Sequence, residues 1–225
     1  MHSRFIVNVP DEELESIQRV CFQIEQAHWF YEDFVREENP RLPSLSLKHF
    51  SLMLFRHCPL LHHWADDHEH AFARFMEYKT RVPVCGAIIL NHNLTKILLV
   101  RGWKSSASWG FPKGKINKDE PEIACAVREV YEEIGFDTSP YIRQNEYVER
   151  TMSEQHIRLY IIAGIPESTE FSTKTRKEIG VILLTIFGLQ HFSAASSTNI
   201  DGSPKKLKFY LVTSFVSALR RWVCR

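Results

Sequence analysis

The sequence lacks a large net charge, and it lacks a long hydrophobic run. Its 225 residues carry 28 Lys and Arg against 27 Asp and Glu, which leaves a formal net charge of +1. Because no global field attracts nucleic acid to such a protein, an anionic partner must be bound through local patches. The longest apolar run, residues 179–187, is interrupted by Gly180 and Thr185 and is far shorter than the ~20 residues that a membrane span requires. We therefore expect no membrane association.

Cysteine is also scarce, and its spacing is not that of a metal site. None of the five cysteines belongs to a C-x-x-C pair; they are Cys21, Cys58, Cys85, Cys125 and Cys224. An odd number of scattered cysteines is typical of reduced thiols in the cytosol or nucleus. The first residues, Met1 to Val7, have no signal-peptide shape. These features favour a soluble intracellular protein.

Helical periodicity is what the first third of the chain does contain. Apolar residues recur at helical spacing after Asp11, a candidate cap residue, and Pro40 and Pro43 then break the pattern. Two further helices are expected, one from Phe50 to near Pro59 and one from Asp66 to Tyr78. The sequence therefore predicts a small all-α domain over residues 1–80. The residues that carry the first helix are Ile17, Val20, Cys21, Ile24, Ala27, Trp29, Phe30 and Phe34.

Strand patterns begin after Thr80, and strands and helices alternate from there to the end. Strands are expected at residues 84–90, 96–100 and 157–165, and a helix with a basic end at 209–222. The Ser- and Lys-rich stretch from Ser193 to Lys208 is expected to be a mobile loop. The fold class is therefore α+β, with a second domain over residues 81–225.

The stretch from Gly114 to Phe136 is the most informative part of the chain. Asp119, Glu120 and Pro121 form a helix start, with an acid as the cap and proline in the first turn. An apolar stripe follows at spacings of 4, 3 and 4, and Gly135 is expected to end the helix in the left-handed conformation. The stripe consists of Ile123, Val127, Val130 and Ile134.

Three carboxylates lie outside that stripe on the same helix. Glu129 and Glu133 are one turn apart and Glu132 is adjacent, an arrangement that is mildly destabilising without a cation. Hard oxygen ligands suit Mg²⁺ or Mn²⁺, so the three predict a divalent metal site; the alternative is a solvated acidic face. Arg128 is expected to face elsewhere and to pair with Glu120. Before the helix, the flexible stretch 110–115 offers Lys113 and Lys115 to a phosphate.

The full pattern resembles the box of the Nudix hydrolases, G-x5-E-x7-R-E-U-x-E-E-x-G-U, at every fixed position. The resemblance implies an α/β/α sandwich with a mixed sheet and a metal-dependent hydrolase of a nucleoside diphosphate linked to another group. In the box, Gly114, Glu120, Arg128 and Gly135 occupy the structural positions. Glu129, Glu132 and Glu133 occupy the metal-binding positions, and Glu133 is also a catalytic residue.

Nearly the whole chain is similar to the catalytic subunit family of the eukaryotic mRNA decapping enzyme. The stretches that carry this resemblance are residues 21–34, 82–90, 109–115, 158–162 and 175–179. A helical domain ahead of the Nudix domain is also typical of that family. The resemblance implies hydrolysis of the cap triphosphate of mRNA, with release of 7-methyl-GDP and RNA bearing a 5′ monophosphate. It further implies an activator subunit that docks on the helical domain, and residence in cytoplasmic processing bodies or the nucleus.

The same resemblance assigns roles to residues outside the box. Glu178 matches the general base; by itself it reads as a surface glutamate. Trp29 and Asp33 match the residues that recognise the cap, and Tyr210 matches a further cap contact. Without the resemblance, Trp29 would be taken as a core aromatic and Asp33 as a solvated acid.

The C-terminal segment matches the basic RNA-binding helix of the family. Its candidate phosphate contacts are Lys205, Lys206, Lys208, Arg220 and Arg221, and such binding weakens with salt; the alternative is a solubilising end. Leu183 and Leu184 depart from the family, which usually has a polar residue and a Trp there. Two other functions therefore stay open: a Nudix hydrolase of free nucleotides, such as dinucleoside polyphosphates or nucleotide sugars, and a catalytically silent RNA-binding scaffold.

Overall fold

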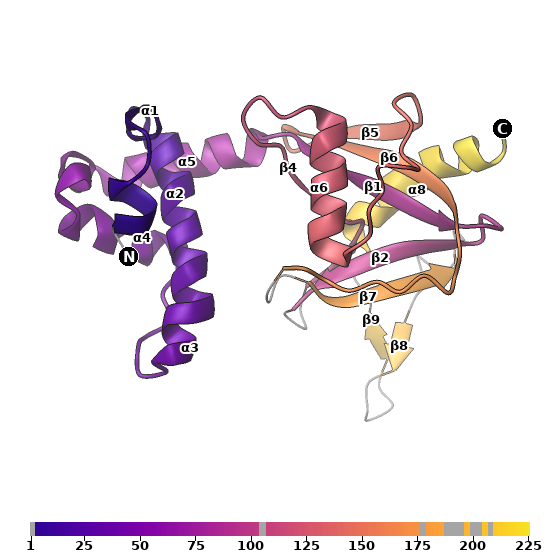
Figure 1. Cartoon of the computed structure of the whole chain (residues 1–225), viewed down its shortest axis with the longest axis horizontal. Helices are drawn as coiled ribbons and strands as arrows, with labels where there is room; N and C mark the ends of the chain where they lie inside the picture. Colours follow the sequence, from indigo (N-terminus) through magenta and orange to yellow (C-terminus); the bar gives the residue numbers. More distant parts are fainter. Residues whose placement is uncertain (1–2, 104–106, 176–178, 187–195, 199–203, 207–208) are drawn as a thin grey trace. The chain divides into compact units, whose positions relative to one another are not determined.

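In the computed structural model the chain divides into two compact units, Met1–Arg81 and Val82–Arg225 (Figure 1). The structure describes residues 3–103, 107–175, 179–186, 196–198, 204–206 and 209–225. Within these ranges, none of the helices combines the length and the apolar character needed to cross a membrane.

The first unit is entirely helical, as its periodicity predicts. Its long helix, α2, begins after Ser16, whose Oγ accepts a hydrogen bond from the backbone N–H of Arg19 at 3.3 Å. Ser16 is therefore the cap of the main helix, whereas Asp11 is the first residue of the short helix α1 and does not cap it. The helices are η1 Ser3–Val7, α1 Asp11–Leu14, α2 Ile17–Phe30, η2 Tyr31–Val35, α3 Arg36–Glu38, α4 Leu47–His57, η3 Pro59–Trp64 and α5 His68–Arg81.

The core of this unit is built from the apolar stripes of α2, α4 and α5. Ile24, Phe50 and Phe75 are each fully buried, one from each helix. Glu25 is buried beside them and forms an ion pair with Lys79, so that its charge is compensated. The three amphipathic helices thus bury one face each, which is the physical basis of the unit.

The second unit contains a seven-stranded sheet, in which the main path runs β3-β2-β1-β6-β5. Strand β4 pairs with β1, and β7 pairs with β2. Among the described strands of this sheet, only β1 and β6 pair in parallel; the other pairs are antiparallel, so the sheet is mixed, as predicted. The strands are β1 Val84–Asn91, β2 Lys96–Gly102, β3 Trp109–Gly110, β4 Lys113–Lys115, β5 Tyr147–Met152, β6 Gln155–Ile165 and β7 Ile179–Ile186.

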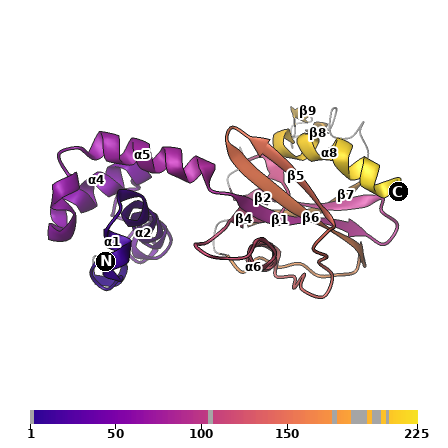
Figure 2. The same ribbon diagram turned by 90° about the horizontal axis from the view of Figure 1, so that it is seen from above.

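Two helices cover opposite faces of this sheet (Figure 2). Successive strand residues alternate between the faces, so Ile88 packs with the helix α8, Tyr210–Val223, while Ile89 packs with the helix α6, Glu122–Ile134. The result is the α/β/α sandwich that the sequence predicts. Helix α6 is the helix of the three glutamates.

One expected loop contains regular structure. Ser196–Thr198 and Pro204–Lys206 form strands β8 and β9, which pair antiparallel as a separate two-stranded sheet. The prediction of a structureless loop from Ser193 to Lys208 is therefore wrong for these residues. The remaining residues of that stretch lie outside the described part of the chain.

Candidate active site

Helix α6 begins at Glu122, later than the acidic cap predicted from the sequence would place it. Pro121 is the N-cap residue, with φ −63° and ψ 141°, and no side chain caps the helix. Asp119 instead occupies a turn with φ 58°, and Glu120 accepts a hydrogen bond from the backbone N–H of Asn117 at 2.8 Å. The predicted acidic cap is therefore wrong. The predicted end is confirmed: Gly135 has φ 70°, and its N–H donates to the carbonyl of Tyr131 at 2.8 Å.

The buried face of α6 is wider than the predicted stripe, and it includes one of the glutamates. Val130 and Ile134 are fully buried, whereas Ile123 and Val127 are only half-buried. Glu133 is 8% exposed, so the expectation that all three carboxylates lie outside the apolar face is wrong for this residue. The core also takes in Cys125 and Ala126 from the same helix.

Glu133 is directed at the strand that precedes the helix in sequence. Its Oε2 accepts a hydrogen bond from the backbone N–H of Lys113 in β4 at 3.1 Å. Burial lowers the pKa of the Lys113 ammonium, while the nearby charges of Glu133 and Glu129 act in the opposite direction. A buried carboxylate thus lies beside a half-buried lysine, an arrangement that is typical of functional sites as well as of structural ion pairs.

Glu129 packs directly over Gly114 of the same strand. A Cβ added to Gly114 would lie 2.0 Å from Oε2 and 2.4 Å from Oε1 of Glu129. No larger residue fits at position 114 unless the carboxylate moves. Gly114 is therefore required by this close approach, rather than by the flexible backbone that the sequence suggested.

Arg128 connects the carboxylates on this side of α6. It binds Glu120 through two hydrogen bonds, Nε to Oε1 at 2.8 Å and Nη2 to Oε2 at 2.9 Å, so the predicted pair is present. Its Nη1 also donates to Glu129 at 2.7 Å and to Glu132 at 3.3 Å. The prediction that Arg128 faces away from the metal-binding glutamates is thus wrong. The hydrogen bonds that Arg128 donates to Glu120 lower the pKa of Glu120, and the hydrogen bond from the backbone N–H of Asn117 acts in the same direction.

The donor chemistry of the three glutamates suits a divalent cation, because all of the donors are carboxylate oxygens. Their present arrangement does not gather them: among the described residues, no group of three or more His, Cys, Asp or Glu side chains is placed so as to hold a metal ion. Glu129 and Glu132 are bound to Arg128, and Glu133 lies beside Lys113. Metal binding would require Glu129 and Glu132 to exchange the guanidinium for the cation.

The candidate cap-binding residues of the first unit lie on α2 and its continuation. Trp29 is 51% exposed near the end of α2, so it is not the core aromatic of the alternative interpretation. Asp33 lies four residues further on in η2 and is half-buried. This exposed indole is available to stack on a ligand.

The other candidates are placed only in part. Tyr210 is the first residue of α8, and Arg220 and Arg221 lie in the last turn of that helix. Lys205 and Lys206 belong to β9. Glu178 and Lys208 lie outside the described residues.

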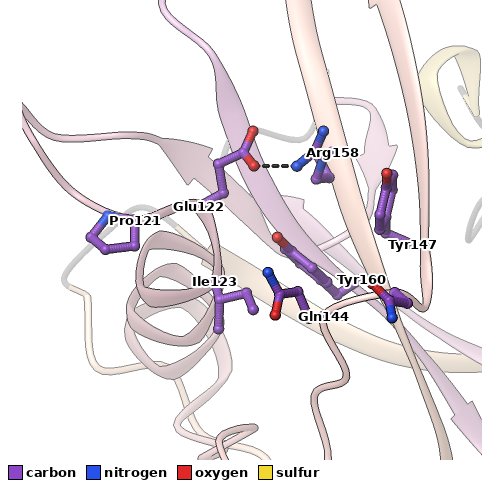
Figure 3. A pocket seen from close by; sticks show the side chains of 8 residues that line it. Pro121, Glu122, Ile123, Gln144, Tyr147, Arg158 and Tyr160 are labelled. Carbon is purple, nitrogen blue, oxygen red and sulfur yellow. Dashed lines mark hydrogen bonds and ion pairs between the residues drawn. The ribbon is translucent and has the colours of Figure 1, made fainter.

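The sequence did not single out two recesses beside strand β5. The larger one, with a volume of about 370 Å³, is lined by residues from the start of α6, from β5 and β6 and from the loop before β5 (Figure 3). None of the three glutamates lines it. Residues so far apart in sequence carry no local pattern, although Arg158 and Tyr160 do belong to one of the stretches that resemble the decapping family.

Comparisons with known proteins match both units. Residues 1–78 match the family model described as the Dcp2, box A domain, and residues 80–201 match the NUDIX domain. The chain is 51% identical over 224 residues to the mRNA decapping complex subunit 2 of Schizosaccharomyces pombe, which covers 99% of this chain and 30% of that protein. It is 46% identical over 223 residues to the mRNA-decapping enzyme subunit 2 of Arabidopsis thaliana, covering 99% of this chain and 59% of that protein.

The chain thus spans less than two thirds of the length of these two relatives. Among solved structures, a Caenorhabditis elegans Ap4A hydrolase in a binary complex is similar to 64% of this chain and 98% of its own, with a TM-score of 0.47 and 15% identity.

Proposed function

The chain belongs to the Nudix family, and on that premise we propose that it is an mRNA decapping pyrophosphohydrolase. It hydrolyses the 5′ cap triphosphate, releasing 7-methyl-GDP and leaving RNA with a 5′ monophosphate. One observation carries the proposal: a Dcp2 box A domain at residues 1–78 stands directly ahead of a NUDIX domain at 80–201. The relatives that share both parts are named as decapping enzyme subunits.

Nudix hydrolases use divalent metal ions, and we propose Mg²⁺ or Mn²⁺ here. Glu129, Glu132 and Glu133 would hold the cation, which supplies neutralisation of phosphate charge and a more acidic water. Lys113 and Lys115 flank Gly114 in β4 and orient the phosphates. We assign Glu178 the role of general base, which takes the proton of the attacking water.

Recognition of the cap is assigned to Trp29, Asp33 and Tyr210. The exposed face of Trp29 can stack on 7-methylguanine, whose positive charge adds a cation–π attraction. Asp33 can accept hydrogen bonds from the guanine edge. Trp29 and Asp33 are four residues apart on continuous helix, so both can reach the same base.

The proposal includes the RNA body, a protein partner and a compartment. Binding of the RNA phosphate backbone is assigned to Lys205, Lys206, Lys208, Arg220 and Arg221. Docking of an activator subunit is assigned to the helical unit. The cellular location is the cytoplasm, in processing bodies, with the nucleus as the alternative.

Product analysis tests the function directly. With Mn²⁺ and cap-labelled RNA, the wild type should release labelled 7-methyl-GDP, and Glu133→Gln should release none. Glu170→Gln, which changes an exposed glutamate of the same unit, is the matched control and should act like the wild type. If Glu133→Gln keeps its activity, the mechanism is wrong.

The same proteins distinguish the other two functions. If dinucleoside polyphosphates or nucleotide sugars are cleaved as well as capped RNA is, so that an RNA body gives no benefit, the protein is a hydrolase of free nucleotides. Metal-independent RNA binding without turnover would identify a silent scaffold. As a second readout, Mn²⁺ should raise the melting temperature of the wild type and of Glu170→Gln, but raise that of Glu133→Gln much less.

A further inference from the structure

The larger recess beside β5 is separate from the glutamates of α6. It lies between the first turn of α6 and strands β5 and β6 (Figure 3). Glu122 lines it at the start of the helix, whereas Glu133 is near the end, roughly 16 Å away along the axis at ~1.5 Å per residue. A ligand in this recess would therefore not be the reacting pyrophosphate.

Arg158 forms a fixed platform on one side of the recess. Its guanidinium carbon lies 4.4 Å from the centroid of the Tyr147 ring. It donates to Glu149 at 2.8 and 3.1 Å and forms an ion pair with Glu122 (Figure 3). Because these two carboxylates already balance its charge, Arg158 does not make the recess an anion site. What it offers a ligand is a rigid, planar surface.

The remaining lining combines aromatic rings with uncommitted amides. Tyr147 presents the exposed ring, and the buried Tyr160 packs against it with 6.0 Å between the ring centroids. Gln144 and Asn145 are exposed, and neither side chain hydrogen-bonds to any residue that the structure describes. Proteins bind unpaired RNA bases by stacking them on aromatic rings or guanidinium planes, and by hydrogen-bonding to their edges. The chemistry of this recess matches that requirement.

A second recess, of about 230 Å³, shares Tyr147 with the first. It lies between β5 and the end of α8 and is lined by Arg150, Arg221 and Arg225. None of these three arginines forms an ion pair with another described residue; Arg150 donates only to backbone carbonyls, at 3.4 Å. Glu149 also lines this recess, but its carboxylate is bound to Arg158. The three arginines therefore leave the recess with an excess of positive charge, which suits a phosphate group.

Strand β5 is an edge strand, and the two recesses flank it. A single-stranded RNA that crosses this edge would place a base on one side and a phosphate on the other. We propose that the Tyr147 recess binds an unpaired base of the RNA body, read by Gln144 and Asn145. Arg150 and Arg225, together with Arg221, hold a neighbouring phosphate. This subsite rests on the proposed action on RNA, and it adds residues of β5 and its preceding loop to the basic end of α8.

The test measures RNA affinity rather than turnover. A fluorescent, uncapped RNA oligonucleotide of about ten nucleotides is titrated into the wild type and into Gln144→Ala/Asn145→Ala. Both side chains are exposed and without hydrogen bonds to described residues, so the variant should fold normally. Losing two hydrogen bonds should weaken binding about tenfold. Asn93→Ala, which removes an exposed amide elsewhere in the unit, is the matched control and should bind like the wild type.

An oligonucleotide with abasic sites separates base from phosphate. It should bind the wild type more weakly than the normal RNA does, and the amide variant should bind it no less tightly than the wild type. Arg150→Ala should weaken the binding of both oligonucleotides. If the amide variant binds normal RNA as tightly as the wild type, the base subsite does not exist. If instead it loses only its stimulation by a protein activator, the recess is a protein-binding surface and the proposal is overturned.

Failure of this subsite and failure of the proposed function give different results. If the wild type releases 7-methyl-GDP and the amide variant binds RNA as tightly as the wild type does, the subsite alone is rejected. If the amide variant binds RNA more weakly than the wild type but the wild type releases no 7-methyl-GDP, decapping is rejected and the subsite is kept.

Discussion

The carboxylate of Glu129 fills the space in which a side chain at Gly114 would lie: a Cβ on Gly114 would lie 2.1 Å from the carboxylate carbon of Glu129. Gly114 belongs to β4, which pairs with β1, and Glu129 belongs to α6, which packs on the same sheet. The two residues of the Nudix pattern are thus one packing unit. The carboxylate of Glu129, a candidate metal ligand, is positioned by the absence of a side chain in the strand beneath it.

Gly114→Ala should displace the Glu129 carboxylate and lower kcat/KM for capped RNA by about 100-fold, because misplacement by about 1 Å at a reacting site has an effect of that order. Gly110→Ala is the control, since the nearest atom to its new Cβ is Nζ of Lys113 at 3.5 Å, an ordinary contact. Steady-state kinetics of 7-methyl-GDP release measures the effect. Full activity in Gly114→Ala would show that the position of Glu129 is unimportant.

Glu120→Gln should destabilise the protein by about 1–2 kcal/mol at pH 7, because it weakens a two-bond ion pair with Arg128. The pKa of Glu120 in the folded protein is lowered from 4.5. Its stabilising contribution is therefore complete above that pH and is lost as the pH falls through the folded pKa. Urea unfolding at pH 7, 4 and 3 should show the difference from the wild type shrinking at the two acidic values. A difference that does not depend on pH would contradict the charged interaction.

Trp29→Ala should leave the free energy of unfolding within about 0.5 kcal/mol of the wild type, since the side chain is 51% exposed. Its affinity for 7-methyl-GDP should fall about tenfold or more, because the stacking surface is removed. Calorimetric titration measures the affinity. Tyr78→Ala removes another exposed aromatic of the same unit and should bind the nucleotide normally. Equal affinities for Trp29→Ala and wild type would exclude Trp29 from cap recognition.

Asn91→Ala should destabilise the protein by about 2–3 kcal/mol without entering the chemistry. The Asn91 side chain is 2% exposed and accepts hydrogen bonds from the N–H groups of Thr95 and Lys96 at 2.8 and 2.9 Å. Its amide nitrogen donates to Thr95 and Glu167. Urea denaturation provides the measurement, with the exposed Asn93→Ala as control. A loss below 0.5 kcal/mol would mean that water replaces these bonds.

Local pattern was sufficient for much of the fold. The helical periodicity of residues 17–30, the apolar run at 84–90 and Gly135 at the end of α6 each predicted an element that the structure contains. These features depend on neighbours a few residues away, so they can be read from one stretch of chain. The metal-binding role of the three glutamates stays a prediction from their spacing and from the resemblance to a family.

Contacts between distant segments decided the rest. Spacing along α6 could not predict that Glu133 is buried, because burial depends on Lys113 and the sheet beneath it. Of the three carboxylates bound to Arg128, Glu120 belongs to the preceding loop. Glu129 and Glu132 follow Arg128 by one and four residues on α6 itself, so these two contacts are local. The recess at Tyr147 joins residues from one helix, two strands and a loop, so it exists only once the sheet has formed.

The sequence by itself determined the long helices, the strands at 84–90, 96–100 and 157–165, and which helix carries the acidic residues. It could do so because periodicity and turn chemistry act over a few residues. The tertiary structure alone decided which carboxylate is buried and which residues line the recess at Tyr147. Burial and electrostatic pairing depend on distances in space, and these are set by the pairing of strands that lie up to dozens of residues apart in the chain.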